Sequence, residues 1–225
     1  MENIKIKELI EFNRKSAGNK KNFALRLRTR IKKEKSNSGG GHYWISSLST
    51  IRNVFKTRNI ELLNEKISIL NDIISASDSD KKKIRFQRNL DVLLNFTDFD
   101  FDEITPSFEL TFQTKIKSHS VIRINRLPIL INPDFVVSFN NGDRNEIGAI
   151  WFVTFITGYK YWELGLFVEA MNKYLHKHYS EEFFINKSYC IAVDINTGRN
   201  ISFQDVENGK APYLLEQTIT DINQM

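Results

Sequence analysis

Acidic side chains inside apolar segments are the residues of this chain whose surroundings could support chemistry. Asp134 follows Pro133 within the run ILINPDFVVSF, and Asp194 ends the run CIAVD. A carboxylate within an apolar strand needs either a cation or a set of hydrogen bonds, because an unpaired buried charge is costly. For Asp134 a functional and a structural role are both open. Asp194 precedes Asn196-Thr197-Gly198, and we expect it to cap that turn.

The histidines and the cysteine do not predict a metal site or a catalytic site. His176 and His178 are two residues apart on an expected helix, so they project about 200° from each other and do not chelate one ion. His42 and His119 have no partner in the sequence. Cys190 lies in an apolar segment and is expected to be a buried thiol, and a single cysteine agrees with a reducing cytoplasm.

Cations are concentrated in the first hundred residues. Residues 1–100 contain 21 Lys and Arg against 12 Asp and Glu, whereas residues 101–225 contain 11 against 15. Residues 14–35 contain ten Lys and Arg and one acidic residue, Glu34. This excess of positive charge is larger than solubility needs. Clustered Lys and Arg bind phosphates without reading bases, so this segment predicts contact with DNA or RNA, with an acidic protein surface as the alternative. The predicted contact residues are Lys20, Lys21, Arg26, Arg28, Arg30, Lys32, Lys33 and Lys35.

Length and composition are those of an ordinary globular protein. The chain has 225 residues and 41% hydrophobic content, enough for one large domain or a domain with a helical extension. Its longest apolar run, residues 147–156, falls short of the roughly 20 residues that cross a bilayer. The first residues lack the apolar core of a signal peptide. We therefore expect a cytoplasmic protein without a membrane partner.

The first 96 residues predict a basic helical region. Gly18 is expected to end the first helix, and residues 25–32 also alternate as a strand would, although a helix is favoured. The glycines at residues 39–41 are expected to form a flexible connector and not a phosphate-binding loop, because no Gly-Lys-Ser/Thr follows them. Apolar residues recur at helical spacing in residues 3–16, 22–35, 44–55, 60–75 and 80–95.

Residues 97–225 predict a sheet with covering helices. Asn140-Asn141-Gly142-Asp143 is a hairpin signal, and residues 147–155 are typical of a strand buried on both faces. The fold class expected is α/β (α+β), with a mixed, mainly antiparallel central sheet flanked by helices and an N-terminal helical layer. Regions 1–96 and 97–225 form two parts or pack as one domain. Strands are expected at residues 107–117, 121–124, 128–139, 146–155, 188–195 and 201–203, and helices at 161–179 and 211–222.

The order helix, three antiparallel strands, helix, strand over residues 80–195 resembles the core of the PD-(D/E)XK, or restriction-endonuclease-like, superfamily. In active members two carboxylates hold a divalent cation and a lysine orients the attacking water. The resemblance implies Asp134, after Pro133, as metal ligand and catalytic residue, and Glu146 as the second carboxylate. The motif lysine is absent, because Gly148 stands at its position. With the register shifted inward, Ala149 and Trp151 occupy the two positions.

A second resemblance involves GAIWF, the helix after it and CIAVDINTG. These segments are similar to an uncharacterised group of bacterial proteins with this degenerate core, whose upstream Gly-Gly-x-x-Tyr-Trp-like segment is matched by GGHYW at residues 40–44. The match strengthens the expected fold and leaves the activity open.

The resemblance and the basic region together predict a nucleic-acid-associated protein with a degenerate, inactive core. It would bind DNA or RNA, or act beside a protein partner subunit in a nucleic-acid-processing or defence assembly. One alternative is an active nuclease in which Lys160 or Lys115 replaces the motif lysine and Glu109 or Glu163 adds a carboxylate. The other is a protein-interaction scaffold. No cofactor is expected unless the core is active, in which case it is Mg²⁺.

Overall fold

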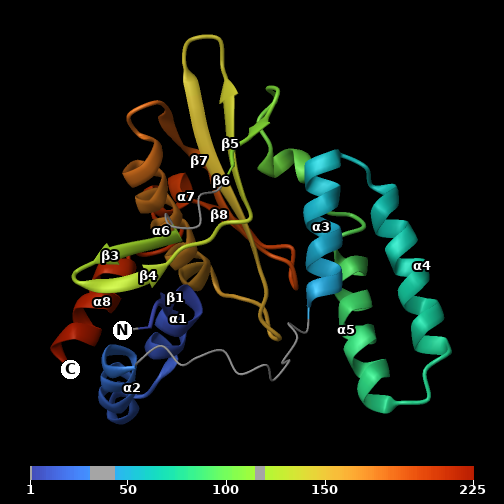
Figure 1. Ribbon diagram of the computed structural model, residues 1–225, viewed down its shortest axis with the longest axis horizontal. Coiled ribbons are helices and arrows are strands. Elements are labelled where there is room, and N and C mark those ends of the chain that lie inside the picture. Colours follow the sequence, from blue (N-terminus) through green and yellow to red (C-terminus); the bar gives the residue numbers. More distant parts are fainter. Residues whose placement is uncertain (1, 31–43, 115–119) are drawn as a thin grey trace.

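The computed structural model describes residues 2–30, 44–114 and 120–225, which fold into helices around two sheets (Figure 1). The predictions for Lys115, His42, His119 and the glycines at residues 39–41 lie outside this part of the chain. The described elements are β1 (Ile4–Lys5), α1 (Ile6–Arg14), α2 (Ala17–Thr29), α3 (Ile45–Thr57), α4 (Glu61–Ser75), α5 (Asp80–Asn95), a 3₁₀ helix (Phe101–Ile104), β2 (Thr111–Phe112), β3 (Val121–Ile124), β4 (Leu127–Leu130), β5 (Phe135–Asn140), β6 (Asn145–Val153), α6 (Tyr161–Tyr179), β7 (Phe184–Asp194), β8 (Asn200–Ser202), α7 (Phe203–Glu207) and α8 (Leu215–Gln224).

The larger sheet has the strand order β2-β5-β6-β7-β8. Only β6 and β7 are parallel among its described pairs, and α6 forms the crossover between them; the other three pairs are antiparallel. This mixed, mainly antiparallel sheet flanked by helices confirms the predicted fold class. The apolar sequence of β6 follows from its position, since a central strand is buried on both faces.

The hairpin between β5 and β6 forms where the sequence predicts it. Asn140 pairs with Asn145, and the Asn140 side-chain oxygen accepts a hydrogen bond from Gly142 N at 2.7 Å. Gly142 has φ +95°, a conformation that glycine adopts without a steric cost. The turn therefore sets the β5–β6 register, in which Phe135 lies opposite Ile150.

Two strand predictions are corrected, the first by a smaller sheet with the order β1-β4-β3. Residues 128–139 do not form one strand: β4 belongs to the smaller sheet and β5 to the larger one. The break falls at Pro133, which has no N–H to continue a ladder of hydrogen bonds. The strand predicted over residues 107–117 is limited, among the described residues, to Thr111–Phe112.

Two hydrophobic cores lie on opposite faces of the larger sheet. Along β6, Ala149 and Val153 face a core with α1, α2, α6 and α8, whereas Ile150 and Phe152 face one with α3, α4 and α5. This division follows from the alternation of side chains along a strand. The N-terminal helices therefore do not form one layer. Figure 1 shows α1 and α2 on one side of the sheet and α3–α5 on the other.

The predicted helix bounds agree best with the structure where the helical spacing of apolar residues continues over the most residues. The bounds of α5 and α6 are those expected, and α2 is helical where a strand was the alternative. Gly18, however, lies inside α2; the first helix ends at Arg14, where Lys15 becomes extended at ψ 145°. The strand β1 and the short helix α7 were not predicted. Within the described ranges, no helix has the length and apolarity to cross a membrane.

Candidate functional site

Asp134 lies just before β5 and is held by the protein itself. One carboxylate oxygen accepts a hydrogen bond from Phe152 N at 2.8 Å, and the other forms an ion pair with the Arg52 guanidinium of α3. The Asp134 side chain is 8% exposed. Its own N–H donates to Ile150 O at 2.9 Å, which fixes the residue against β6. The carboxylate thus joins the α3–α5 layer to the sheet.

Glu146 does not meet Asp134. Asp134 bonds to β6 at Ile150, and the four residues from there to Glu146 correspond to roughly 13 Å along a strand. Glu146 is buried at the hairpin end of the sheet, where its oxygens accept hydrogen bonds from Asn141 at 2.7 Å and from the Asn186 side chain. Arg144 Nε lies 3.0 Å from it. The structure therefore keeps the two predicted catalytic carboxylates apart.

The surroundings of Asp134 do not fit a divalent cation. The β6 residues that bond to Asp134 through their main chains, Ile150 and Phe152, have apolar side chains and supply no second carboxylate, which a divalent cation would require. Gly148, at the position of the motif lysine, has no room for any side chain, because a Cβ there would lie 2.4 Å from Tyr189 O. Among the described residues, no group of three or more His, Cys, Asp and Glu is placed to hold a metal ion.

The predicted basic contact residues fall into three sets. Arg28 donates to Asn223 O at 3.0 Å, and Arg30 forms ion pairs with Glu2 and Glu8, so these two arginines hold α2 against its neighbours. Lys20, Lys21 and Arg26 lie on α2, and Lys32, Lys33 and Lys35 lie outside the described residues. Lys21 and Arg26 are exposed, and Lys20 is half-buried over the ring of Phe12.

A second cationic segment was missed by the sequence reasoning. The first turns of α5 carry Lys81, Lys82, Lys83 and Arg85, all exposed, and none of them forms an ion pair within the described residues. Asp80 is the acidic residue of that first turn. The three consecutive lysines are the sequence signal for this segment. The prediction rested on the longer basic run of residues 14–35.

A crevice of about 670 Å³ opens at the carboxyl ends of β6 and β7. In α/β folds these strand ends, beside a crossover helix, are where ligands commonly bind. The crevice is bounded by the end of α1, the β6–α6 connection, the start of α6 and the β7–β8 turn. Its lining residues are Asn13, Arg14, Thr157, Gly158, Tyr159, Lys160, Trp162, Glu163 and Arg199.

A buried aspartate organises the floor of the crevice. Asp194 accepts hydrogen bonds from Tyr159 N and Thr197 Oγ1, both at 2.8 Å, and from Asn196 N at 3.1 Å, in the turn-capping role expected of it. Gly158 has φ +72°, and a Cβ there would lie 2.9 Å from Asp194 Oδ2. Burial, and next the charge of Asp194, raise the pKa of the Tyr159 hydroxyl, which therefore stays neutral. The two turns are thus locked together.

One wall of the crevice is an arginine fixed by a buried carboxylate. Arg14 Nε and Nη2 donate to the two oxygens of Glu163 at 2.5 and 2.8 Å, and Glu163 also accepts from Lys160 N at 2.8 Å. Glu163 is fully buried. The hydrogen bonds to Glu163 raise the pKa of the Arg14 guanidinium above its ordinary value. The guanidinium also stacks 4.2 Å from the centroid of the Phe155 ring.

The crevice contains two residues of the active-nuclease alternative, Lys160 and Glu163. The sequence suggested both as alternative catalytic residues. In the structure they line the same crevice, although the Glu163 carboxylate is engaged by Arg14. Glu109 lines a different cavity, beside Asn145 at the hairpin end of the sheet. Arg199 was not predicted. Its position after a turn at the end of a parallel strand is the signal that could have identified it.

The fold and the site define a mixed α/β protein with a cationic crevice at the ends of two parallel strands. No family model matches the chain, and no curated protein or solved structure matches it either.

Proposed function

We propose that the protein binds nucleic acid through its basic helices and does not cleave it. The observation that carries this proposal is the exposed cluster of Lys81, Lys82, Lys83 and Arg85 on α5. Cations in the first turn of a helix oppose its dipole and typically cost about 0.3–1 kcal/mol each at low ionic strength. Helix stability therefore does not account for the cluster, whereas binding of phosphates does.

The absence of cleavage is inferred from Asp134. In the larger sheet α5 is followed by the antiparallel strands β2, β5 and β6, then by α6 and β7, with β3 and β4 of the smaller sheet inserted between β2 and β5; this arrangement supports the nuclease resemblance. On such a core Asp134 would bind the catalytic cation. Its engagement with Arg52 and Phe152 N supports a structural role in its place, and the distance to Glu146 supports the same view. A binding module built on a nuclease-like core agrees with both observations.

Binding is tested by titrating salt against labelled duplex and single-stranded oligonucleotides. The substitutions Lys81→Gln, Lys82→Gln and Lys83→Gln, made together, should reduce the slope of log Kobs against log salt by about 2 to 3, since each phosphate contact contributes about 0.7–0.9. The matched variant Lys20→Gln/Lys21→Gln/Arg26→Gln removes the same charge from α2 and should reduce the slope less. No detectable binding at about 50 mM salt would contradict the proposal.

Cleavage is tested by incubating the protein with plasmid, single-stranded DNA and RNA in Mg²⁺ or Mn²⁺. We expect the substrates to remain intact. Cleavage by the wild type that disappears in Asp134→Ala would establish the alternative of an active nuclease. A protein partner is tested by affinity capture with and without nuclease treatment: association that persists after treatment would favour the scaffold alternative.

A further inference from the structure

We propose that the crevice at the ends of β6 and β7 binds a phosphate group of single-stranded nucleic acid, with a neighbouring base against the aromatic side chains of its rim. This inference rests on the proposed function and names the form of nucleic acid that a second site takes. The site is separate from Asp134, which lies at the start of β5, and from the basic cluster of α5.

The charge of the crevice points to an anion. Arg14, Lys160 and Arg199 come from α1, the β6–α6 connection and the β7–β8 turn, and they meet at one cavity. Glu163 is the carboxylate of the lining, and its oxygens already accept hydrogen bonds from Arg14 and from Lys160 N. Three cations against two engaged carboxylates, Glu163 in the lining and Asp194 at the floor, leave the crevice positive. A phosphate oxygen accepts hydrogen bonds from such groups, which become stronger when one partner is charged.

The rim of the crevice supplies apolar surfaces next to these cations. Trp162 is half-buried in the lining, and the Phe155 ring, on which the Arg14 guanidinium stacks, is 36% exposed. Bases of single-stranded nucleic acid stack on aromatic side chains while cations follow the backbone. In a duplex the faces of the bases are already stacked on each other. Aromatic side chains beside cations therefore favour a single strand over a duplex.

Contacts within the protein hold the arginines of the crevice in place. Glu163 and the Phe155 ring hold the Arg14 guanidinium in place, and Arg199 Nη1 lies 3.5 Å from Tyr159 O. A guanidinium that is already ordered loses less side-chain entropy when it binds a ligand. The volume of about 670 Å³ falls within the range of roughly 300–1,000 Å³ that is usual for small-ligand sites. The crevice therefore has room for a nucleotide unit.

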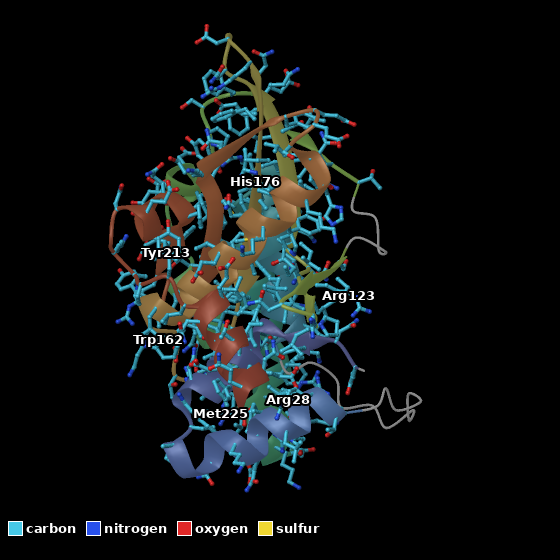
Figure 2. All side chains as sticks on the ribbon, turned by 90° about the vertical axis from the view of Figure 1, so that its left-hand side faces the viewer. Arg28, Arg123, Trp162, His176, Tyr213 and Met225 are labelled. Atoms are coloured by element: carbon cyan, nitrogen blue, oxygen red, sulfur yellow. The ribbon has the colours of Figure 1, made fainter. Side chains whose placement is uncertain are left out.

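The test uses fluorescence anisotropy of a labelled deoxythymidine 12-mer with the full chain. Lys160→Gln/Arg199→Gln should weaken binding and reduce the salt slope by about 1.4, because each single-strand phosphate contact contributes about 0.7. Both side chains are exposed, so the fold should persist, as circular dichroism will check. The matched control Arg123→Gln/Lys177→Gln removes the same charge and should change neither quantity. Arg123 lies across the molecule from Trp162 in Figure 2, and Lys177 is in the last turn of α6.

Stacking is tested separately from charge. Trp162→Leu should weaken binding of the 12-mer roughly tenfold with an unchanged salt slope, because stacking on an aromatic ring is not an ionic contact. Trp162→Phe keeps an aromatic face and should restore most of the affinity. A purely structural role of Trp162 would instead alter the melting temperature of both variants without this rescue.

The outcomes separate this inference from the proposed function. If the Lys160→Gln/Arg199→Gln variant binds like its charge-matched control while the α5 variant loses affinity, the crevice inference is wrong and the proposed function stands. Equal affinity of the wild type for a 12-base-pair duplex and for the 12-mer overturns the single-strand preference. Failure of the wild type to bind either probe at about 50 mM salt overturns both proposals.

Discussion

Arg52 of α3 and Asp134 at the start of β5 form an ion pair between the helical layer and the sheet. The Asp134 side chain is 8% exposed and that of Arg52 is 38% exposed, so the pair lies at the edge of the core and not within it. Phe152 N donates a hydrogen bond to the second carboxylate oxygen of Asp134. The aspartate that a nuclease-like motif would assign to catalysis is thus the residue that attaches α3 to β6.

We expect Asp134→Ala to lower the free energy of unfolding by about 2 kcal/mol, less than the 3–5 kcal/mol of a fully buried pair because Arg52 is partly solvated. Asp134→Asn should cost less, since an amide oxygen can still accept from Phe152 N. Urea unfolding measures the stability of both Asp134 variants, of Arg52→Ala and of the double variant Arg52→Ala/Asp134→Ala. The cycle gives the coupling energy between Arg52 and Asp134, which we expect to be about 1 kcal/mol. Additive effects, or a rise in melting temperature with Mg²⁺ that Asp134→Ala removes, would contradict this role.

Gly148→Ala should destabilise the protein by about 2 kcal/mol, because overpacking against a fixed neighbour is costly. The added methyl would lie 2.4 Å from Tyr189 O, a backbone atom of β7, at the point where the β6–β7 register shifts. Gly18→Ala is the matched control: it lies in α2, where the added methyl meets nothing within 4 Å beyond its chain neighbours and the backbone of its own helix, and it should stabilise the chain by about 0.5 kcal/mol. Chemical denaturation compares the two, and equal effects would contradict the close approach of β6 and β7.

Glu169 should make stability depend on pH. Burial raises the pKa of its carboxyl above the ordinary value, although Leu214 N, Leu215 N and Lys173 favour the charged form. The folded protein then holds the proton more tightly than the unfolded chain, so the contribution of Glu169 is greatest below its unfolded pKa and declines as the pH rises through the folded pKa. Glu169→Gln keeps an oxygen for the two N–H groups and does not titrate.

The measurement is the unfolding free energy of the wild type minus that of Glu169→Gln, taken by urea denaturation at several pH values. We expect this difference to fall as the pH rises from the unfolded pKa of the Glu169 carboxyl through its raised folded pKa. Glu216 adds a repelling charge nearby, which acts in the same direction. A difference that increases with pH would contradict the raised pKa.

Much of the local structure of this protein is predictable because its causes are local. The apolar spacing of residues 80–95 and 161–179 defines α5 and α6 at their observed bounds, and the Asn-Asn-Gly-Asp turn defines the β5–β6 hairpin. Helical periodicity and turn conformation depend on neighbouring residues, so a single sequence contains them.

The tertiary structure alone decided what the polar residues meet. Asp134 was a carboxylate that needed a partner, and the packing of α3 on the sheet supplied Arg52 where the motif suggested a cation. In the sequence, Gly148 only marked the position where the motif lysine is missing. The structure shows that β7 approaches so closely that no side chain fits there. Residues 128–139 form one apolar run in the sequence. In the structure the run is divided at Pro133 between β4 of the smaller sheet and β5 of the larger one.

The crevice shows the same limit most clearly. Arg14, Lys160 and Arg199 belong to three distant segments, and no periodicity connects them. They converge because β6 and β7 are parallel, which brings the turns after both strands to one edge of the sheet, and because α1 packs against α6 there through Arg14 and Glu163. The sequence determined which residues are charged, and long-range strand pairing determined which of those charges act together.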